Sequence, residues 1–158
     1  MHHAPITALT PAEQRVADQL VGGLNARAIA AEMHLSPNTV SAYLRATRAK
    51  LHCPPRCATH VLAHRLLSTQ QVPAPAPAGP PPDLDPRQQR LLNALAEHTS
   101  SYDIALAAQL APADVRPAVE DLLAGTGADD TTQLVVQGHA WGLLGTVAKS
   151  DVPEVVSQ

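Results

Sequence analysis

A polar and basic stretch, Ser36 to Leu51 (SPNTVSAYLRATRAKL), holds the residues best suited to chemistry with another molecule. Ser36 can cap a helix, because its hydroxyl can accept a hydrogen bond from a backbone N–H one turn later. Pro37 fits the first helical position, where a missing N–H costs nothing. Val40 and Leu44 then fall on one face, which can pack on a core. The pattern predicts a helix with one apolar and one polar face.

The polar face of this predicted helix combines short hydrogen-bonding side chains with cations. This mixture suits DNA, because Lys and Arg pair with phosphates and polar side chains read base edges. A surface helix with a solvated basic face explains the same pattern, and this stretch alone does not separate the two interpretations. The residues concerned are Asn38, Thr39, Ser41, Arg45, Arg48 and Lys50.

Three further short helices are predicted around this one. The segment TPAE at 10–13 is a capping box that opens the first helix, and Gly22-Gly23 ends it, since glycine tolerates the left-handed conformation. A second helix is predicted over 26–33, with Asn25 as its cap, and a fourth over 58–67. Two short helices joined by a tight turn make a helix-turn-helix.

Composition and charge divide the 158 residues into two halves. Residues 1–72 hold seven Lys or Arg and three acids, a formal charge of +4, whereas 73–158 hold four and eleven, a charge of −7. There is no Phe and one Trp, which suits small helical bundles of Ala, Leu, Val and Ile. No apolar run approaches the about 20 residues of a membrane span, no signal peptide is evident, and two cysteines make no disulfide framework. We therefore expect a cytoplasmic protein.

A Pro/Ala-rich linker, QQVPAPAPAGPPP at 70–82, separates the halves and should be extended, at roughly 3 Å per residue. Beyond it the first half recurs, shifted by 75 positions without a gap, with identities that include Ile29/Ile104, Val61/Val136 and His64/His139. The predicted boundaries are 1–69 for a first unit, 70–82 for the linker, 83–145 for a second unit and 146–158 for a flexible tail.

The first unit resembles the DNA-binding domain of the LuxR family of bacterial regulators, also called GerE-like or NarL/FixJ-type. LTPAE at 9–13, GLNARAIA at 23–30, LSPNTVSAYL at 35–44 and AKL at 49–51 carry the resemblance. It implies an all-α fold of two tandem four-helix units. In this family the third helix enters the major groove and the fourth commonly mediates dimerisation.

The resemblance also implies roles for individual residues. The family usually has an apolar residue where Thr47 stands and Lys or Arg where Ser41 stands. Without a cation at Ser41, this chain lacks a DNA contact worth about 1–3 kcal/mol if it is bidentate. Arg48 and Lys50 complete the predicted DNA-binding set. By resemblance Asn38 and Thr39 should touch phosphate, Ser41, Ala42 and Arg45 should face bases, and Arg27 should reach the DNA backbone.

The second unit also resembles the family, but its counterpart of the polar helix is altered. Ala111 replaces the Ser36 cap, and Pro117 lies six residues into the helix, where it costs roughly 3 kcal/mol and must kink the helix or delay its start. Glu120 and Asp121 replace Arg45 and Ala46. We expect no DNA binding through this helix. The unit is either retained for stability, or offers an acidic surface for a partner protein or for masking the basic half.

The sequence supports other kinds of functional site less strongly. Cys53, Cys57, His60 and His64 have spacings that resemble a zinc site, but packing is favoured over metal or redox sensing because the family has apolar residues at two of these positions. Trp141 aligns with Leu66 and is expected in the core. No catalytic triad, paired carboxylates or phosphate loop occurs, so we expect neither an enzyme, nor a cofactor, nor a metal.

The leading hypothesis is a DNA-binding transcriptional regulator. It would bind double-stranded DNA through the first unit as a homodimer, because one unit offers few base contacts. The alternative is an adaptor or antagonist that binds another regulator or RNA polymerase and not DNA. A third possibility is an intramolecular pseudo-dimer of the two units.

Overall fold

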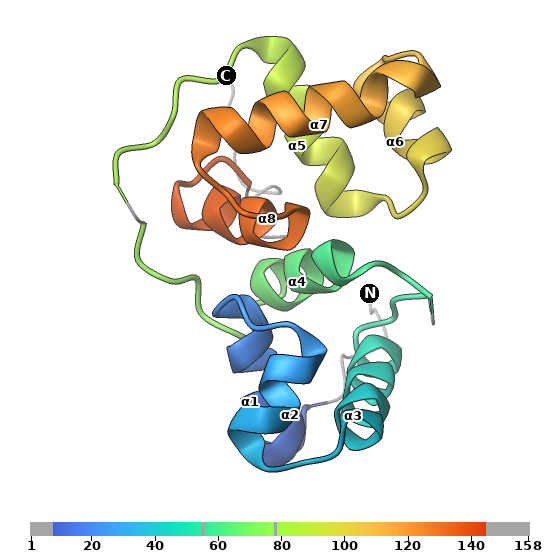
Figure 1. Cartoon of the computed structure of the whole chain (residues 1–158), viewed down its shortest axis with the longest axis vertical. Helices are drawn as coiled ribbons and strands as arrows, with labels where there is room; N and C mark the ends of the chain where they lie inside the picture. The colour runs from blue at the N-terminus through green and yellow to red at the C-terminus, as the bar shows by residue number, and fades with distance from the viewer. Residues whose placement is uncertain (1–7, 55, 78, 145–158) are drawn as a thin grey trace, which may run out of the picture.

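The computed structural model describes residues 8–54, 56–77 and 79–144, and this part of the chain is all-α, with eight helices and no strand. The first group of helices is α1–α4 and the second is α5–α8, and they form the lower and upper parts of Figure 1. The bounds are α1 Pro11–Val21, α2 Ala26–Met33, α3 Pro37–Lys50, α4 Thr59–Ser68, α5 Pro86–Glu97, α6 Ser101–Ala108, α7 Pro112–Thr126 and α8 Thr131–Ala140. The tail expected at 146–158 lies outside the described residues.

Local capping signals set the starts of the first three helices, as the sequence predicts. Thr10 and Glu13 form the expected capping box, with both reciprocal bonds present. The side chain of Asn25 accepts from the Ala28 N–H at 2.9 Å, and that of Ser36 from the Thr39 N–H at 3.1 Å. These three predictions are confirmed, while α4 begins at Thr59, one residue later than expected.

The second group repeats these capping devices 75 residues later. Asp85 and Gln88 form a capping box, and Ser100 accepts from the Asp103 N–H at 3.1 Å. The helices α2 and α6 end alike, because His34 and Gln109 are both left-handed, with φ of 57° and 62°. The first three helices of the two groups therefore start 75 residues apart, and their ends match to within one residue.

The α7 helix departs from its counterpart α3 at its start and in its first turns. Ala111 makes no side-chain capping bond, as expected from the loss of serine. The helix nevertheless begins at Pro112 and continues through Pro117, so the delayed start that we considered does not occur. Pro117 and Ala113 are exposed. The Ala113 carbonyl, which lacks its N–H donor one turn on, can therefore be hydrated.

The last helix of each group breaks the ungapped register. The helix α8 begins 72 residues after α4, because the connection from α7 to α8 is shorter than that from α3 to α4. Two matching hydrogen bonds show the same shift. Gln14 donates to the Gln71 carbonyl at 2.9 Å and Gln89 to the Leu143 carbonyl at 3.0 Å, and the two acceptor residues are 72 positions apart. The sequence pairings Val61/Val136 and His64/His139 are thus wrong by three residues.

Trp141 does not occupy the core position expected for it. It is the C-cap of α8, is half-buried, and donates its indole N–H to the Gly79 carbonyl at 3.1 Å. With the register shifted by three, the counterpart of Leu66 is Gly138, which is buried, and Trp141 corresponds to the half-buried Thr69.

Two hydrophobic clusters form the core, and α8 belongs to both. Leu134 and Val135 pack in the second cluster with residues of α5–α7. Val136, the next residue, packs in the first cluster with residues of α1–α4. The most extensive helix packing is between α4 and α8, which lie side by side at the centre of the molecule (Figure 1). None of the described helices is long and apolar enough to span a membrane.

Candidate nucleic-acid interface

The α3 helix presents a polar face to solvent because its apolar residues pack inward. Val40, Leu44 and Thr47 are buried, and the Thr47 hydroxyl donates to the Tyr43 carbonyl at 2.8 Å, which satisfies it in place of the expected apolar residue. The helix packs against α1 and α2. Of the predicted site residues on α3, the exposed ones are Asn38, Ser41, Ala42 and Arg45.

The N-terminus of α3 is organised by two hydroxyls. The Ser36 and Thr39 hydroxyl oxygens lie 2.9 Å apart, and Ser36 also caps the Thr39 N–H. Because each hydroxyl has one donor and two acceptor positions, Thr39 keeps capacity for a further bond. Thr39 is half-buried, whereas Asn38 beside it is exposed. Arg27, near the start of α2, is also exposed on this helix pair.

Lys50 does not join this exposed face. Its Nζ donates to Glu13 on α1, whose side chain is nearly buried. Burial raises the pKa of Glu13, but hydrogen bonds from Lys50 and from the Thr10 backbone outweigh it, so the pKa lies below the ordinary 4.5. Lys50 therefore holds the end of α3 against the start of α1.

Arg48 also turns inward. Its Nε donates to the Cys57 carbonyl at 3.1 Å, and the side chain is half-buried. This bond ties α3 to the connection that leads into α4. The periodicity of α3 shows only which residues share a face, so it could not reveal the hydrogen-bond partners of Arg48 and Lys50.

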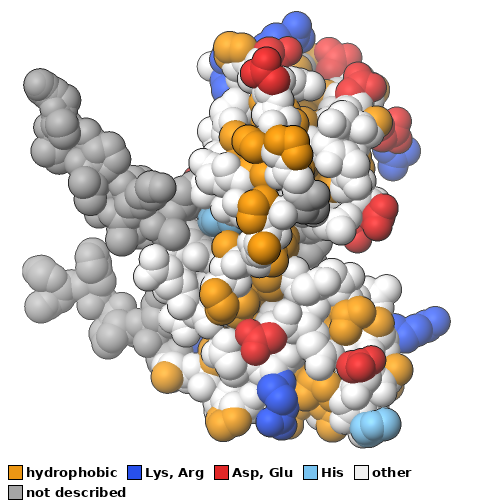
Figure 2. All heavy atoms as spheres, turned by 90° about the vertical axis from the view of Figure 1, so that its left-hand side faces the viewer, with side chains coloured by type: hydrophobic (Ala, Val, Ile, Leu, Met, Phe, Trp, Pro, Cys, Tyr) orange, Lys and Arg blue, Asp and Glu red, His pale blue; other side chains and the backbone are white. Residues whose placement is uncertain are grey.

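The second group leaves this face uncovered. Arg27, Ser41 and Arg45 stay exposed with α5–α8 in place, so masking of the basic half is not observed at these residues. The matching helix α7 exposes Asp114, Glu120 and Asp121 with a single cation, Arg116. Figure 2 shows the side of the molecule crossed by the linker, where acidic side chains lie mainly on the upper group.

The two cysteines belong to the core rather than to a ligand site. Cys53 and Cys57 are buried in the first cluster. Burial and the neighbouring Cys57 raise the pKa of Cys53 to about 11, so its metal-binding thiolate form is disfavoured. Within the described ranges, no three His, Cys, Asp or Glu side chains lie close enough to hold a metal ion.

The histidines of the same sequence motif face the second group instead. His60 Nδ1 lies 2.6 Å from the Leu95 carbonyl oxygen of α5, and since a carbonyl can only accept, Nδ1 carries the proton. His64 Nδ1 lies 2.9 Å from His139 Nε2 of α8. Sequence spacing gave no sign of these partners, which are 35 and 75 residues away.

All three histidine side chains favour the neutral form. Burial lowers the pKa of His60, against a smaller rise from its bond to Leu95. Burial also lowers the pKa of His64, where Glu97 acts in the opposite direction and Arg65 adds to the decrease. Burial and the neighbouring His64 lower the pKa of His139 to about 4.

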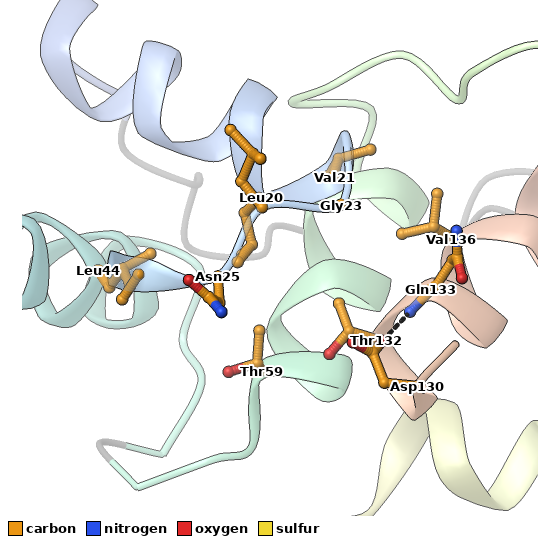
Figure 3. A pocket seen from close by; sticks show the side chains of 12 residues that line it. Leu20, Val21, Gly23, Asn25, Leu44, Thr59, Asp130, Thr132, Gln133 and Val136 are labelled. Atoms are coloured by element: carbon orange, nitrogen blue, oxygen red, sulfur yellow. Dashed lines mark hydrogen bonds between the residues drawn. The ribbon is translucent and has the colours of Figure 1, made fainter. Parts of the chain in front are cut away.

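A cavity of about 200 Å³ lies between the first group and the start of α8 (Figure 3). Leu20 and Leu44 line it from the first group, and Thr132 and Val136 from α8. It is smaller than the roughly 300–1,000 Å³ of typical ligand pockets. We therefore treat it as a feature of the interface between the groups.

Comparison with known proteins finds one family that the first group resembles. Residues 7–63 match the GerE family of bacterial regulatory proteins, the luxR family. The match covers α1–α3 and the first half of α4. No curated protein and no solved structure matches the chain.

Proposed function

We propose that this protein regulates transcription by placing α3 in the major groove of DNA, because residues 7–63 match the luxR family of bacterial regulatory proteins, which are DNA-binding regulators. The observation that carries the proposal is the exposed polar face of α3, with Arg45 at its middle. At the N-terminus of α3, the Asn38 N–H and the positive dipole end favour a phosphate, whereas Pro37 has no N–H and those of Thr39 and Val40 are bonded to Ser36.

The exposed residues divide into two roles. Arg27 on α2 and Asn38 and Thr39 at the start of α3 hold the DNA backbone and fix the register. Ser41, Ala42 and Arg45, further along α3, face the bases. Arg45 is the one exposed cation among the described residues of α3, and a bidentate bond from arginine to guanine is worth about 1–3 kcal/mol.

Two residues of the predicted DNA-binding set are instead assigned a structural role. Lys50 and Arg48 already have partners within the first group, in Glu13 and the Cys57 carbonyl. We propose that they hold α3 in place and make little direct contribution to DNA affinity. The interface then depends on few cations, and Ser41 offers none where the family usually has one.

The α7 helix is proposed not to bind DNA. It lines up with α3 in chain order, but Glu120 stands at the place of Arg45, and its exposed carboxylates would repel phosphates. A helix that retains Arg116 alone cannot replace the exposed set of α3.

The proposal is tested by titrating DNA binding against salt. Wild-type protein should lose affinity steeply as salt rises, because binding releases counterions from phosphates. Arg45→Glu should abolish specific binding. The matched control is Glu120→Arg, which changes the corresponding residue of α7 by the opposite charge and should leave affinity almost unchanged. Absence of binding at low salt, or equal effects of the two substitutions, would contradict the proposal.

A second candidate function is supported by α6. Tyr102 and Leu106 lie one helical turn apart and are 64% and 62% exposed, and Asp103 lies beside them. Exposed apolar side chains with acidic neighbours suit a protein partner. In this alternative the chain is an adaptor that binds another regulator or RNA polymerase. Stoichiometric capture of such a protein, lost in Leu106→Asp, together with no DNA binding, would favour it.

The homodimer expected from the sequence also needs a surface. In this structure α4 is packed against α8, so a second copy could not pair through α4 in the same way. A homodimer would require another face, or the separation of the two groups.

A further inference from the structure

The contact between α4 and α8 joins matching elements, since each is the last helix of its group. Leu62 and Ala63 of α4 and Leu134 and Val135 of α8 are all buried, and each pair lies 72 residues apart. A twofold dimer pairs the same surface patch from both subunits. Here the two equivalent helices, α4 and α8, belong to one chain.

Two cavities beside this contact are each lined by one group and by the last helix of the other. In the first, of about 200 Å³, Leu20 and Leu44 of the first group meet Thr132 of α8. In the second, of about 390 Å³, Leu95 and Val119 of the second group meet His60 of α4. Each of these residues has its counterpart at the same place in the other cavity, 75 positions away in the first three helices and 72 in the last. Thr59 and Thr131 are related in the same way.

This relation is that of an isologous interface, in which residue i contacts j and the partner's j contacts i. Packing of α4 and α8 alone could arise from any two apolar helices. The matching lining residues of the two cavities indicate that the two groups are related by an approximate twofold axis. The second group therefore stands where a second copy of the first would stand in a symmetric dimer.

The contact also contains features specific to this pair. His64 and His139 share a hydrogen bond across it, and the Ala58 N–H donates to the Thr99 hydroxyl at 2.9 Å. Ala58 makes no side-chain cap for its own helix. Val136 completes the first cluster. The first group thus receives from the second the core residue Val136 and, for the Ala58 N–H before α4, the Thr99 hydroxyl as acceptor.

We propose that the second group is a built-in partner of the first: it occupies the α4 face that a second copy would need, so the chain is a monomer and presents one DNA-reading helix. The monomeric state is independent of DNA binding. The consequence for DNA rests on the function proposed above. One chain reads one half-site, because the twofold-related position holds α7 and its carboxylates.

The first test is the mass of the whole chain by sedimentation equilibrium over a wide range of concentration. Wild type should remain a monomer. Val136→Asp, which places a charge in the first cluster but not in the second, should separate the groups, let the already exposed linker move so that protease cuts it faster, and let chains associate through freed α4 faces. The control Leu106→Asp, with the same charge on an exposed residue of α6, should behave as wild type. A dimeric wild type, or a Val136→Asp protein unchanged in both mass and linker cleavage, would overturn the proposal.

A second pair of variants covers the case in which Val136→Asp fails to fold. His64→Glu with His139→Glu places two carboxylates at the contact and should separate the groups. His64→Lys with His139→Glu replaces the histidine pair by an ion pair and should restore the monomer and protect the linker. Equal linker cleavage and mass in the two double variants would contradict the docked arrangement.

DNA stoichiometry separates this inference from the proposed function. A duplex with one half-site should bind one chain, and a duplex with two symmetric half-sites should bind two chains independently, without a gain in affinity for the second. Cooperative binding of two chains would overturn the built-in partner and leave DNA binding intact. A monomer that binds no DNA would instead overturn the proposed function and leave the built-in partner standing.

Discussion

His64 Nδ1 of α4 and His139 Nε2 of α8 lie 2.9 Å apart, and the two rings are 5.0 Å apart between centroids. One nitrogen must donate and the other accept, so the contact holds one shared proton. Protonating both rings would place two cations face to face. Arg65 lies near this pair, and Glu97 of α5 is the carboxylate that acts on His64.

This contact predicts that the protein loses stability in mild acid. The pKa values of His60, His64 and His139 are lowered in the folded state, the last to about 4, from the ordinary 6.5. Because the folded state then binds fewer protons, the stabilisation is complete above pH 6.5 and is lost as the pH falls from there toward about 4. Urea unfolding followed between pH 7.5 and 4.5 should show this decline.

Two histidine variants separate the interface from other titrating groups. His139→Leu should reduce the decline between pH 6.5 and 4.5, since the most strongly shifted group is removed. His52→Asn should not change it, because His52 is exposed and Asn tolerates its left-handed backbone, with φ of 60°. An identical decline in wild type and His139→Leu would assign the acid sensitivity elsewhere.

Restoring a cation at position 41 should strengthen DNA binding. Ser41 is exposed on the polar face of α3, so arginine can be placed there without burying a charge. Ser41→Arg should increase affinity about tenfold, within the roughly 1–3 kcal/mol of a bidentate contact, and should steepen the salt dependence. Ser41→Ala is the control, with little change expected. Weaker binding by Ser41→Arg would show that this position does not face DNA.

The capping difference between α3 and α7 predicts opposite effects of two substitutions. Ser36→Ala removes a hydrogen bond to the Thr39 N–H and should cost about 1 kcal/mol of unfolding free energy. Ala111→Ser adds the missing side chain at the cap of α7 and should stabilise by up to about 1 kcal/mol. Chemical denaturation of both variants gives the comparison. A neutral Ser36→Ala would contradict the proposed importance of this cap.

Lys50 should matter for stability more than for DNA. Lys50→Met leaves the nearly buried Glu13 carboxylate without its cation and should cost about 1–3 kcal/mol. Since the pKa of Glu13 is lowered in the folded state, its stabilisation exists above pH 4.5 and is lost as the pH falls below it, and the variant should show less of this loss. DNA affinity measured on the folded variant should change far less than in Arg45→Ala.

The sequence by itself determined the helices and the exposed polar face of α3. Thr10, Asn25 and Ser36 cap their helices through bonds to residues three positions away, so the local sequence is sufficient. The exposure of Arg45 follows from the same periodicity that buries Val40 and Leu44. Local hydrogen bonds and helical spacing need no knowledge of the rest of the chain.

The tertiary structure alone decided which surfaces meet. Lys50 pairs with a residue 37 positions away, His64 with one 75 away, and Val136 packs in the core of the other group. The shorter connection before α8 moves this helix by three residues relative to α4. The sequence did not reveal the shift, because the identities at Val136 and His139 fit an alignment without a gap. Partners at such distances depend on how helices pack, and packing is set by the whole chain at once.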